Sequence, residues 1–172
     1  MDKISELQKL LLKEKEVGQS YKIDKITDKI YLGSKEGLNE TDYLKKENIN
    51  NVLSVFDIEP LNNNINHKII KLGDLYCENI IKYFKECIEF IEQSDKIFIH
   101  CDCGISRSSA IVIAYLMYKY KLNFKDAYLY IKRIRPEIDP NNGFRKQLNI
   151  FNDELIKNDY DLNKINFDMI KI

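Results

Sequence analysis

The fold is decided by the stretch from Lys96 to Ser109, which reads KIFIHCDCGISRSS. Its first part has only apolar residues between Lys96 and His100, and this pattern predicts a strand buried on both faces of a sheet. Residues 107–120 carry apolar side chains at helical spacing and predict a helix. The loop between them, residues 101–106, therefore follows the carboxyl end of a central strand, which is where open α/β sheets bind ligands.

Strand and helix patterns alternate on either side of this stretch. Strands are expected at residues 30–33, 52–56, 67–72 and 96–100. Helices are expected at 41–48, capped by Thr41, and at 78–93, 107–120, 124–134 and 141–157. This order predicts an α/β domain with a mostly parallel central sheet of roughly four to five strands, flanked by helices. We expect an N-terminal amphipathic helix within residues 1–20, the domain over residues 21–157 and a polar tail over 158–172.

Length and composition narrow the class of protein. The 172 residues suit one domain, because domains typically have about 100–200 residues. Basic and acidic residues number 27 each, which argues against a nucleic-acid-binding protein that works by neutralising many phosphates. There is no apolar run of the ~20 residues that a membrane span needs, and we expect no lipid anchor and no signal peptide. Four cysteines and two histidines without metal-ligand spacing predict no metal site; we expect no cofactor, and a monomer in the cytoplasm or nucleus.

The 101–106 loop has residues suited to binding a phosphoryl group. Gly104 permits a tight backbone whose N–H groups can turn inward, and the following helix adds the positive end of its dipole. These groups favour the thiolate form of Cys101, and Arg107 offers a planar fork for two phosphoryl oxygens. Such a set supports attack of sulfur on phosphorus through a phosphocysteine intermediate.

A bland interpretation competes with this one. A cysteine and an arginine at this spacing arise by chance in about one such chain in ten. A buried cysteine is also commonly a small core residue. The functional interpretation is favoured because His, Cys, Gly, Ser, Arg and Ser occur together at fixed spacing between a strand and a helix.

The segment His-Cys-x-x-Gly-x-Ser-Arg-Ser, residues 100–108, resembles the signature of dual-specificity protein tyrosine phosphatases. Residues 26–34 and 49–55 are similar to the family's first two strands, and residues 114–117 and 139–148 to its C-terminal helical signatures. The resemblance covers about residues 23–155 and implies a small, stand-alone (atypical) member. It implies hydrolysis of phosphotyrosine and phosphoserine or phosphothreonine, with phosphorylated proteins as partners. The implied phosphate-binding residues are Asp102, Cys103, Gly104, Ile105, Ser106 and Arg107.

A phosphate ester also needs a proton on its leaving oxygen, which a carboxylic acid usually supplies. Asp57 and Asp74 both follow strands, whereas Asp95 precedes its strand and lies at the opposite edge of the sheet. The residues alone leave Asp57 and Asp74 open. The resemblance implies Asp74, because the family's acid stands five residues before an Asn-aliphatic pair, here Asn79-Ile80.

Three further residues are candidates for supporting roles. The Ser108 hydroxyl can donate a hydrogen bond to the Cys101 sulfur, and the resemblance implies that it helps to expel the thiolate; helix capping is its alternative role. His100 is expected to orient the loop through hydrogen bonds rather than to transfer protons. Asn141 either braces the phosphate loop, as the resemblance implies, or belongs only to the turn and helix start of DPNNG.

The variable positions of the loop bear on substrate and on redox chemistry. An acidic Asp102 and an apolar Ile105 make a multiply phosphorylated lipid headgroup or an RNA 5′-triphosphate unfavourable. Cys103 stands where the resemblance implies alanine; either it is another small residue, or it or Cys77 traps an oxidised Cys101 as a disulfide. Two competing functions stay open: a phosphate-binding scaffold without turnover, and an interaction protein whose helix at residues 3–15 docks a partner such as a kinase rather than packing on its own domain.

Overall fold

The sheet is the centre of the molecule. The computed structural model describes residues 22–61 and 64–172, so the helix expected at residues 3–15 lies outside the described residues. In the described part, the sheet has the strand order β1-β2-β5-β3-β4. β1 is antiparallel to β2, and every other neighbouring pair is parallel. The strands are β1 (Ile23–Lys25), β2 (Ile30–Ser34), β3 (Asn51–Ser54), β4 (Asn66–Ile69) and β5 (Ile97–Cys101).

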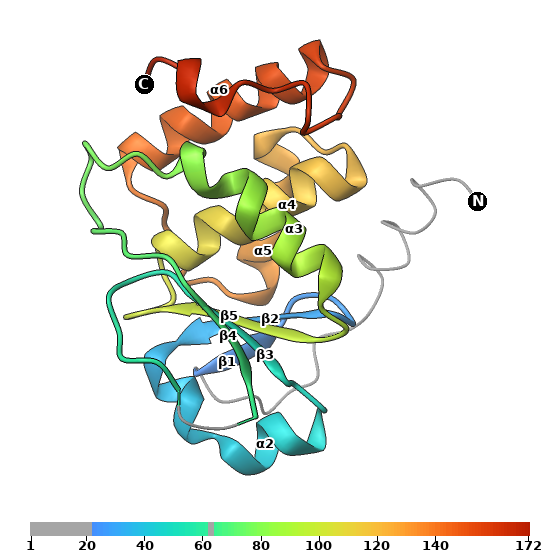
Figure 1. The fold of residues 1–172 in the computed structure, drawn as a ribbon. Helices are drawn as coiled ribbons and strands as arrows, with labels where there is room; N and C mark the ends of the chain where they lie inside the picture. The colour runs from blue at the N-terminus through green and yellow to red at the C-terminus, as the bar shows by residue number, and fades with distance from the viewer. Residues whose placement is uncertain (1–21, 62–63) are drawn as a thin grey trace.

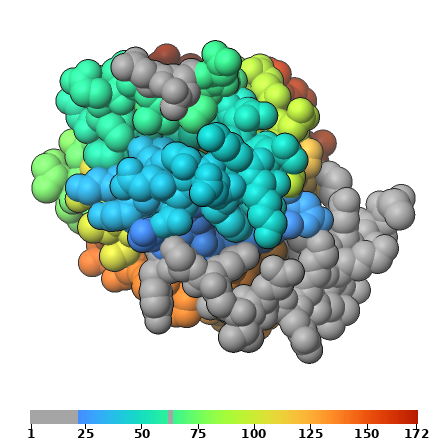
Figure 2. Space-filling view, turned by 90° about the horizontal axis from the view of Figure 1, so that it is seen from below, coloured from blue at the N-terminus to red at the C-terminus, as the bar shows by residue number. Residues whose placement is uncertain are grey.

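Helices cover both faces of this sheet (Figure 1). On one face lie α3 (Phe84–Gln93), α4 (Arg107–Tyr120), α5 (Phe124–Ile134) and α6 (Asn142–Lys157). On the other face lie the 3-10 helix η1 (Lys35–Asn39) and α2 (Thr41–Lys46), which form much of the surface seen from below in Figure 2. The predicted fold class, a mostly parallel sheet flanked by helices, is confirmed.

Alternation along the strands divides the core between the two faces. In β5, Ile97 and Ile99 join the large cluster under the four helices, whereas Phe98 joins the smaller cluster on the α2 side. On the first face, α4 is buried throughout from Ser108 to Met117 and contacts α3, α5, α6 and β5. The strand that ends at Cys101 and the helix that begins at Arg107 are therefore both enclosed, and their dense packing fixes the two ends of the loop between them.

The start of α2 differs from the prediction. Thr41 is the first residue of the helix rather than its cap, and the cap residue Glu40 makes no side-chain capping hydrogen bond. The reason is that η1 runs directly into α2, with the Glu40 N–H bonded to the Gly37 carbonyl. No extended residue remains from which a hydroxyl could reach back to the first helical N–H groups. α2 also ends at Lys46, before the expected residue 48.

The helix expected from residue 78 begins later, as η2 (Ile81–Tyr83) followed by α3. The side-chain oxygen of Gln147, on α6, accepts hydrogen bonds from the backbone N–H groups of Ile80 and Ile81 at 2.9 and 3.0 Å. This distant side chain satisfies N–H groups at the helix start, so residues 78–80 need not be helical. β3 and β4 likewise end earlier than the strands expected at 52–56 and 67–72, and β1 was not expected.

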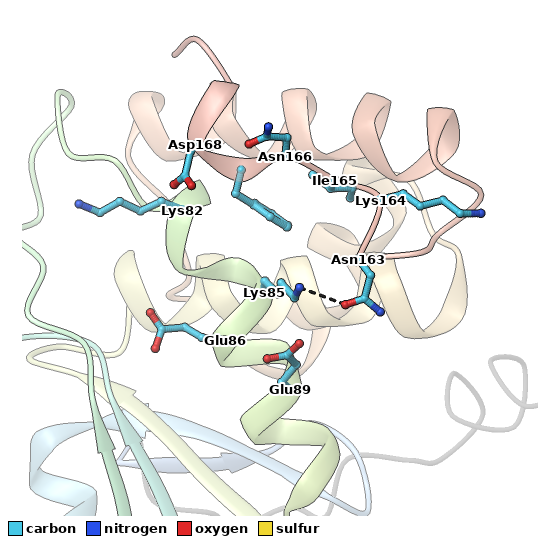
Figure 3. A pocket seen from close by; sticks show the side chains of 10 residues that line it. Lys82, Lys85, Glu86, Glu89, Asn163, Lys164, Ile165, Asn166 and Asp168 are labelled. Carbon is cyan, nitrogen blue, oxygen red and sulfur yellow. Dashed lines mark hydrogen bonds between the residues drawn. The ribbon is translucent and has the colours of Figure 1, made fainter.

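The C-terminal segment, residues 158–172, packs on the domain. Leu162 and Ile165 are buried, and the Phe167 ring lies 6.1 Å from the ring of Phe151 on α6. Between this segment, η2 and α3 lies a hollow of about 480 Å³ with a largely charged lining (Figure 3). None of the described helices is long and apolar enough to cross a membrane.

Candidate active site

The parallel register brings the carboxyl ends of β2, β3 and β5 to one edge of the sheet. Ser34 pairs with Cys101 between β2 and β5, and Ser54 pairs with His100 between β3 and β5. Cys101, the candidate nucleophile, ends β5 and is 2% exposed. It therefore lies at the floor of the site rather than on the surface.

We call residues 101–106 the phosphate loop, and hydrogen bonds to its carbonyl groups hold its backbone in place. Every carbonyl from Cys101 to Ser106 lies within hydrogen-bond distance of a donor. Because the C=O and N–H of a trans peptide point in opposite directions, outward carbonyls turn the loop's N–H groups toward the sulfur. One of them, the Gly104 N–H, lies 3.2 Å from Cys101 Sγ. In chain order, the donors are His100 Nδ1, the Lys35 N–H, Arg135 Nη2, Arg135 Nε, the Asp139 N–H and the Ala110 N–H.

Arg135 is a supporting residue that sequence reasoning missed. It is 2% exposed, and its Nε donates to the Gly104 carbonyl at 2.9 Å and its Nη2 to the Cys103 carbonyl at 3.3 Å. Its Nη1 pairs with the buried carboxylate of Asp24, on β1, at 2.9 Å. The partner charge offsets the desolvation of the guanidinium. The sequence signal was weak, because a charged residue before a proline usually marks an exposed turn.

Gly104 has no substitute at its position. Its φ is +69°, in the left-handed region that favours glycine. A Cβ there would lie 2.3 Å from the Gly33 carbonyl oxygen and 2.8 Å from Arg135 Nη2. The tight backbone predicted for this glycine is thus required both by its dihedral angle and by its neighbours.

Arg107, the first residue of α4, carries an unsatisfied donor. Its Nη1 donates to the Leu72 carbonyl at 3.2 Å, and its guanidinium carbon lies 5.8 Å from the centroid of the Phe56 ring. Its Nε is buried and has no hydrogen-bond partner within residues 22–61 and 64–172. Buried N–H groups without a partner are costly and rare, so this one marks a place for an anionic oxygen.

The two serines at the start of α4 have different partners. The Ser108 hydroxyl donates to Cys101 Sγ at 3.2 Å. The Ser109 hydroxyl instead contacts the carbonyls of Ile105 and Ser106 at 2.5 and 2.9 Å. Neither is the cap residue of α4, which is Ser106. The alternative role considered for Ser108, helix capping, does not match this geometry.

Asp74 lies against the phosphate loop. Its Oδ1 accepts hydrogen bonds from the Ser106 hydroxyl at 2.7 Å and from the Asn141 amide at 2.8 Å. Asn141 also donates its backbone N–H to the Ser106 hydroxyl at 3.0 Å, and its side-chain oxygen caps α6 by accepting from the Phe144 N–H. Asn141 therefore makes both of the contacts that the sequence left as alternatives.

Asp57, the other candidate acid, lies elsewhere. Its carboxylate pairs with Lys71 at 2.8 Å, and both side chains are more than 70% exposed. Of the two aspartates that follow strands, the structure brings Asp74 into contact with the loop and leaves Asp57 on the surface.

The variable positions of the loop turn outward. The Asp102 carboxylate pairs with Lys35 at 2.7 Å, and this partner holds the pKa of Asp102 below its usual value. Cys103 is exposed, and partial burial of its thiol together with the nearby Asp102 raises its pKa, which disfavours the reactive thiolate. Ile105 is 36% exposed.

His100 is buried and uncharged at neutral pH, because burial lowers its pKa to about 4. Its ring stacks on Phe98 with centroids 5.1 Å apart, and the Phe56 ring meets it edge-on at 5.6 Å. The described residues contain no group of three or more His, Cys, Asp or Glu side chains that could hold a metal ion.

Together, the fold and the site place a buried cysteine, an arginine with an unsatisfied N–H group and the N–H of Gly104 at one edge of the sheet. The family model "Dual specificity phosphatase, catalytic domain" matches residues 30–154. A curated relative, "MAP kinase phosphatase with leucine-rich repeats protein 1" of Dictyostelium discoideum, is 37% identical over 143 residues, which cover 81% of this chain and 17% of the relative. This chain thus spans about a fifth of the length of that relative and of a second, similarly named Dictyostelium discoideum protein, of which it covers 21%.

Two solved structures are similar in fold and sequence. The structure of DUSP15 has a TM-score of 0.74 at 34% identity, covering 77% of this chain and 88% of the other. That of the human tyrosine phosphatase-like serine/threonine/tyrosine-interacting protein has a TM-score of 0.74 at 26% identity, covering 80% and 99%. The chain belongs to the dual specificity phosphatase family, which confirms the resemblance seen in the sequence.

Proposed function

We propose that this chain is a protein phosphatase that hydrolyses phosphotyrosine and phosphoserine or phosphothreonine on proteins through a phosphocysteine intermediate. Cys101 is the nucleophile, Arg107 binds the phosphoryl group and Asp74 is the general acid, within a catalytic domain of residues 21–157. The observation that carries this proposal is the convergence on one sulfur: the Gly104 N–H and the Ser108 hydroxyl both lie 3.2 Å from Cys101 Sγ.

In the first step the Cys101 thiolate attacks phosphorus. The S–P bond forms as the bond from phosphorus to the leaving oxygen breaks, and Asp74 in its acid form gives that oxygen a proton. Arg107 and the loop N–H groups hold the other phosphoryl oxygens as charge develops on them. Both hydrogen bonds that Asp74 accepts from described residues go to Oδ1, so Oδ2 is the oxygen that carries the transferable proton.

In the second step a water molecule attacks the phosphocysteine. Asp74, now a carboxylate, takes a proton from the water, and the S–P bond breaks to release inorganic phosphate and the thiolate. The Ser108 hydroxyl stabilises the departing sulfur by the hydrogen bond that it already makes.

The rim of the site supports a protein substrate. Leu75 and Tyr76, directly after Asp74, are 59% and 66% exposed, and Ile105 is exposed next to Ser106. Apolar side chains beside the acid suit a peptide chain, whereas a multiply phosphorylated small molecule would need cations there. The name of the Dictyostelium relative, a MAP kinase phosphatase, supports a phosphorylated kinase as one substrate. A location in the cytoplasm or nucleus stays a prediction.

The second candidate function is a phosphate-binding scaffold without turnover. It is supported by the similarity to the structure of the human tyrosine phosphatase-like serine/threonine/tyrosine-interacting protein. Against it stand the cysteine, the arginine and the acid, all of which are present at the site of this chain.

Hydrolysis of an aryl phosphate decides between the two. We expect turnover by the wild-type protein and a loss of at least about 10⁴-fold in Cys101→Ser, because the nucleophile is gone. Cys77→Ser, a change at an exposed cysteine, is the matched control and should retain activity. Wild-type protein that binds inorganic phosphate but gives no turnover would support the scaffold instead.

A further inference from the structure

The sequence has two histidines, and a chain of hydrogen bonds behind the phosphate loop joins them. The Ser54 hydroxyl lies between the rings, 2.8 Å from His67 Nε2 and 2.6 Å from His100 Nε2. At one end, the Leu61 N–H donates to His67 Nδ1 at 3.2 Å. At the other, His100 Nδ1 lies 3.2 Å from the Cys101 carbonyl oxygen. The chain thus runs from the loop after β3 to the first peptide of the phosphate loop.

The backbone groups at the two ends set the position of every proton between them. The Leu61 N–H can only donate, so His67 Nδ1 holds a lone pair and the neutral ring carries its proton on Nε2. His67 therefore donates to Ser54, whose single hydroxyl proton goes to His100 Nε2. This leaves the His100 proton on Nδ1, facing a carbonyl that can only accept. The two ends require the same donor-to-acceptor direction. Each N–H or O–H group in the chain therefore donates to an acceptor.

Both rings have the neutral form that this direction requires. Burial lowers the pKa of both His67 and His100. His67 lies opposite Val52 in the β3–β4 register, and the titratable group that faces it across Ser54 is His100. The neighbouring Lys68 pairs with Glu86 at 2.8 Å.

We propose that His67 and Ser54 are positioning residues that act through His100 on the Cys101 carbonyl and so fix the first peptide of the phosphate loop. The other carbonyls of that loop are held by backbone N–H groups, by Arg135 or by the Ser109 hydroxyl. Within residues 22–61 and 64–172, the Cys101 carbonyl alone depends on a relay of side chains that begins on β4, at a partly exposed residue. The effect on activity rests on the proposed function, since it assumes that the loop binds a phosphoryl group.

Nitrogen NMR of labelled histidine tests the direction of the chain without any need for turnover. With two histidines in the sequence, one substitution assigns both rings. We expect His67 as the Nε2–H tautomer and His100 as the Nδ1–H tautomer at neutral pH. Either ring in the other tautomer would overturn the proposal. In His67→Phe, Ser54 no longer accepts a hydrogen bond from His67, and this weakens the hydrogen bond that its hydroxyl donates to His100. The His100 Nε2 signal should therefore shift.

Variants test the positioning role. Ser54→Ala should weaken the binding of inorganic phosphate and lower kcat/KM for an aryl phosphate, each by about tenfold, because His100 loses the donor to Nε2. Ser54→Thr keeps the hydroxyl and should restore both. Asn66→Ala, on the same strand but bonded to Asn51, is the control that should leave both unchanged.

The outcomes separate this proposal from the proposed function. If wild-type protein has the expected tautomers and binds phosphate but gives no turnover, the proposed phosphatase activity is wrong. The proposed positioning role of Ser54 and His67 is then still supported. Phosphate binding unchanged in both Ser54→Ala and His67→Phe would overturn the relay even in an active enzyme. His67 is partly exposed, so His67→Phe supplies a folded variant if the buried change at Ser54 prevents folding.

Discussion

Two loops meet at the candidate site, and they are built in opposite ways. The phosphate loop has each carbonyl from Cys101 to Ser106 bonded and its nucleophile buried. In the acid loop, residues 73–79, the side chains of Leu75, Tyr76 and Cys77 are exposed. Its proposed acid, Asp74, is hydrogen-bonded to the rest of the site through Oδ1 alone among the described contacts.

The difference matches the chemistry required of each loop. A phosphoryl group has one size and shape, so a preorganised cradle stabilises it without reorganisation during the reaction. Leaving groups differ between a tyrosine and a serine residue, and an acid held by a single oxygen can approach both. The contrast predicts that the same kind of substitution has unequal effects in the two loops.

Of the substitutions that compare the two loops, we expect the largest loss of turnover from a change of Asp74, the proposed acid. Asp74→Asn should slow turnover of an aryl phosphate by roughly 10²–10⁴-fold and flatten the acid-dependent limb of the pH–rate profile, because the leaving oxygen loses its proton donor. Asp57→Asn is the matched control, and loss of its exposed ion pair with Lys71 should cost little. A normal rate in Asp74→Asn together with a slow Asp57→Asn would mean that the acid has been assigned to the wrong loop.

A glycine in each loop gives the sharpest pairwise test. Gly104→Ala should lower kcat/KM by about 10²-fold and reduce the melting temperature, because the new Cβ meets the Gly33 backbone and the dihedral angle is strained. In Gly73→Ala, the new Cβ would lie 2.7 Å from Glu78 Oε1, and the Glu78 side chain can rotate away. Its activity should stay within about twofold of wild type. Equal losses in both variants would show that the acid loop is as rigid as the phosphate loop.

The last prediction concerns stability rather than rate, at the histidine under the phosphate loop. The pKa of His100 falls from the usual 6.5 to about 4 on folding, so between these pH values the unfolded chain binds a proton that the folded chain does not. Stability is therefore full above pH 6.5 and falls as the pH drops toward 4, by about 3 kcal/mol from this group. Denaturant unfolding at a series of pH values measures this slope, and His100→Gln should flatten it. An unchanged slope in that variant would assign the loss to other groups.

The sequence predicted best what depends on local pattern. The bounds of α4 and α5 agree with the expected helices, because their apolar spacing and flanking residues are local signals. Cys101, Gly104 and Arg107 were identified as site residues from their place between a buried strand and a helix. The choice of Asp74 over Asp57 needed the family resemblance, because both follow strands.

What the sequence could not predict depends on contacts between distant segments. Arg135 and Asp24 are 111 residues apart, and neither position reads as buried. Gln147 changes the start of a helix 66 residues before it, and Ser54 acquires its role only because His67 and His100 lie on either side. No periodicity or short motif encodes such pairs, since each residue is ordinary in its own neighbourhood.

The ion pair between Arg135 and Asp24 has a consequence for how this chain can diverge. Both side chains are at most 9% exposed, so losing either one leaves a buried charge without its partner, at a cost of about 3–5 kcal/mol. Drift at position 24 is therefore coupled to drift at position 135. Descendant sequences that keep a working site should retain both residues or replace both together. Selection on the phosphate loop therefore also acts on β1, a three-residue edge strand.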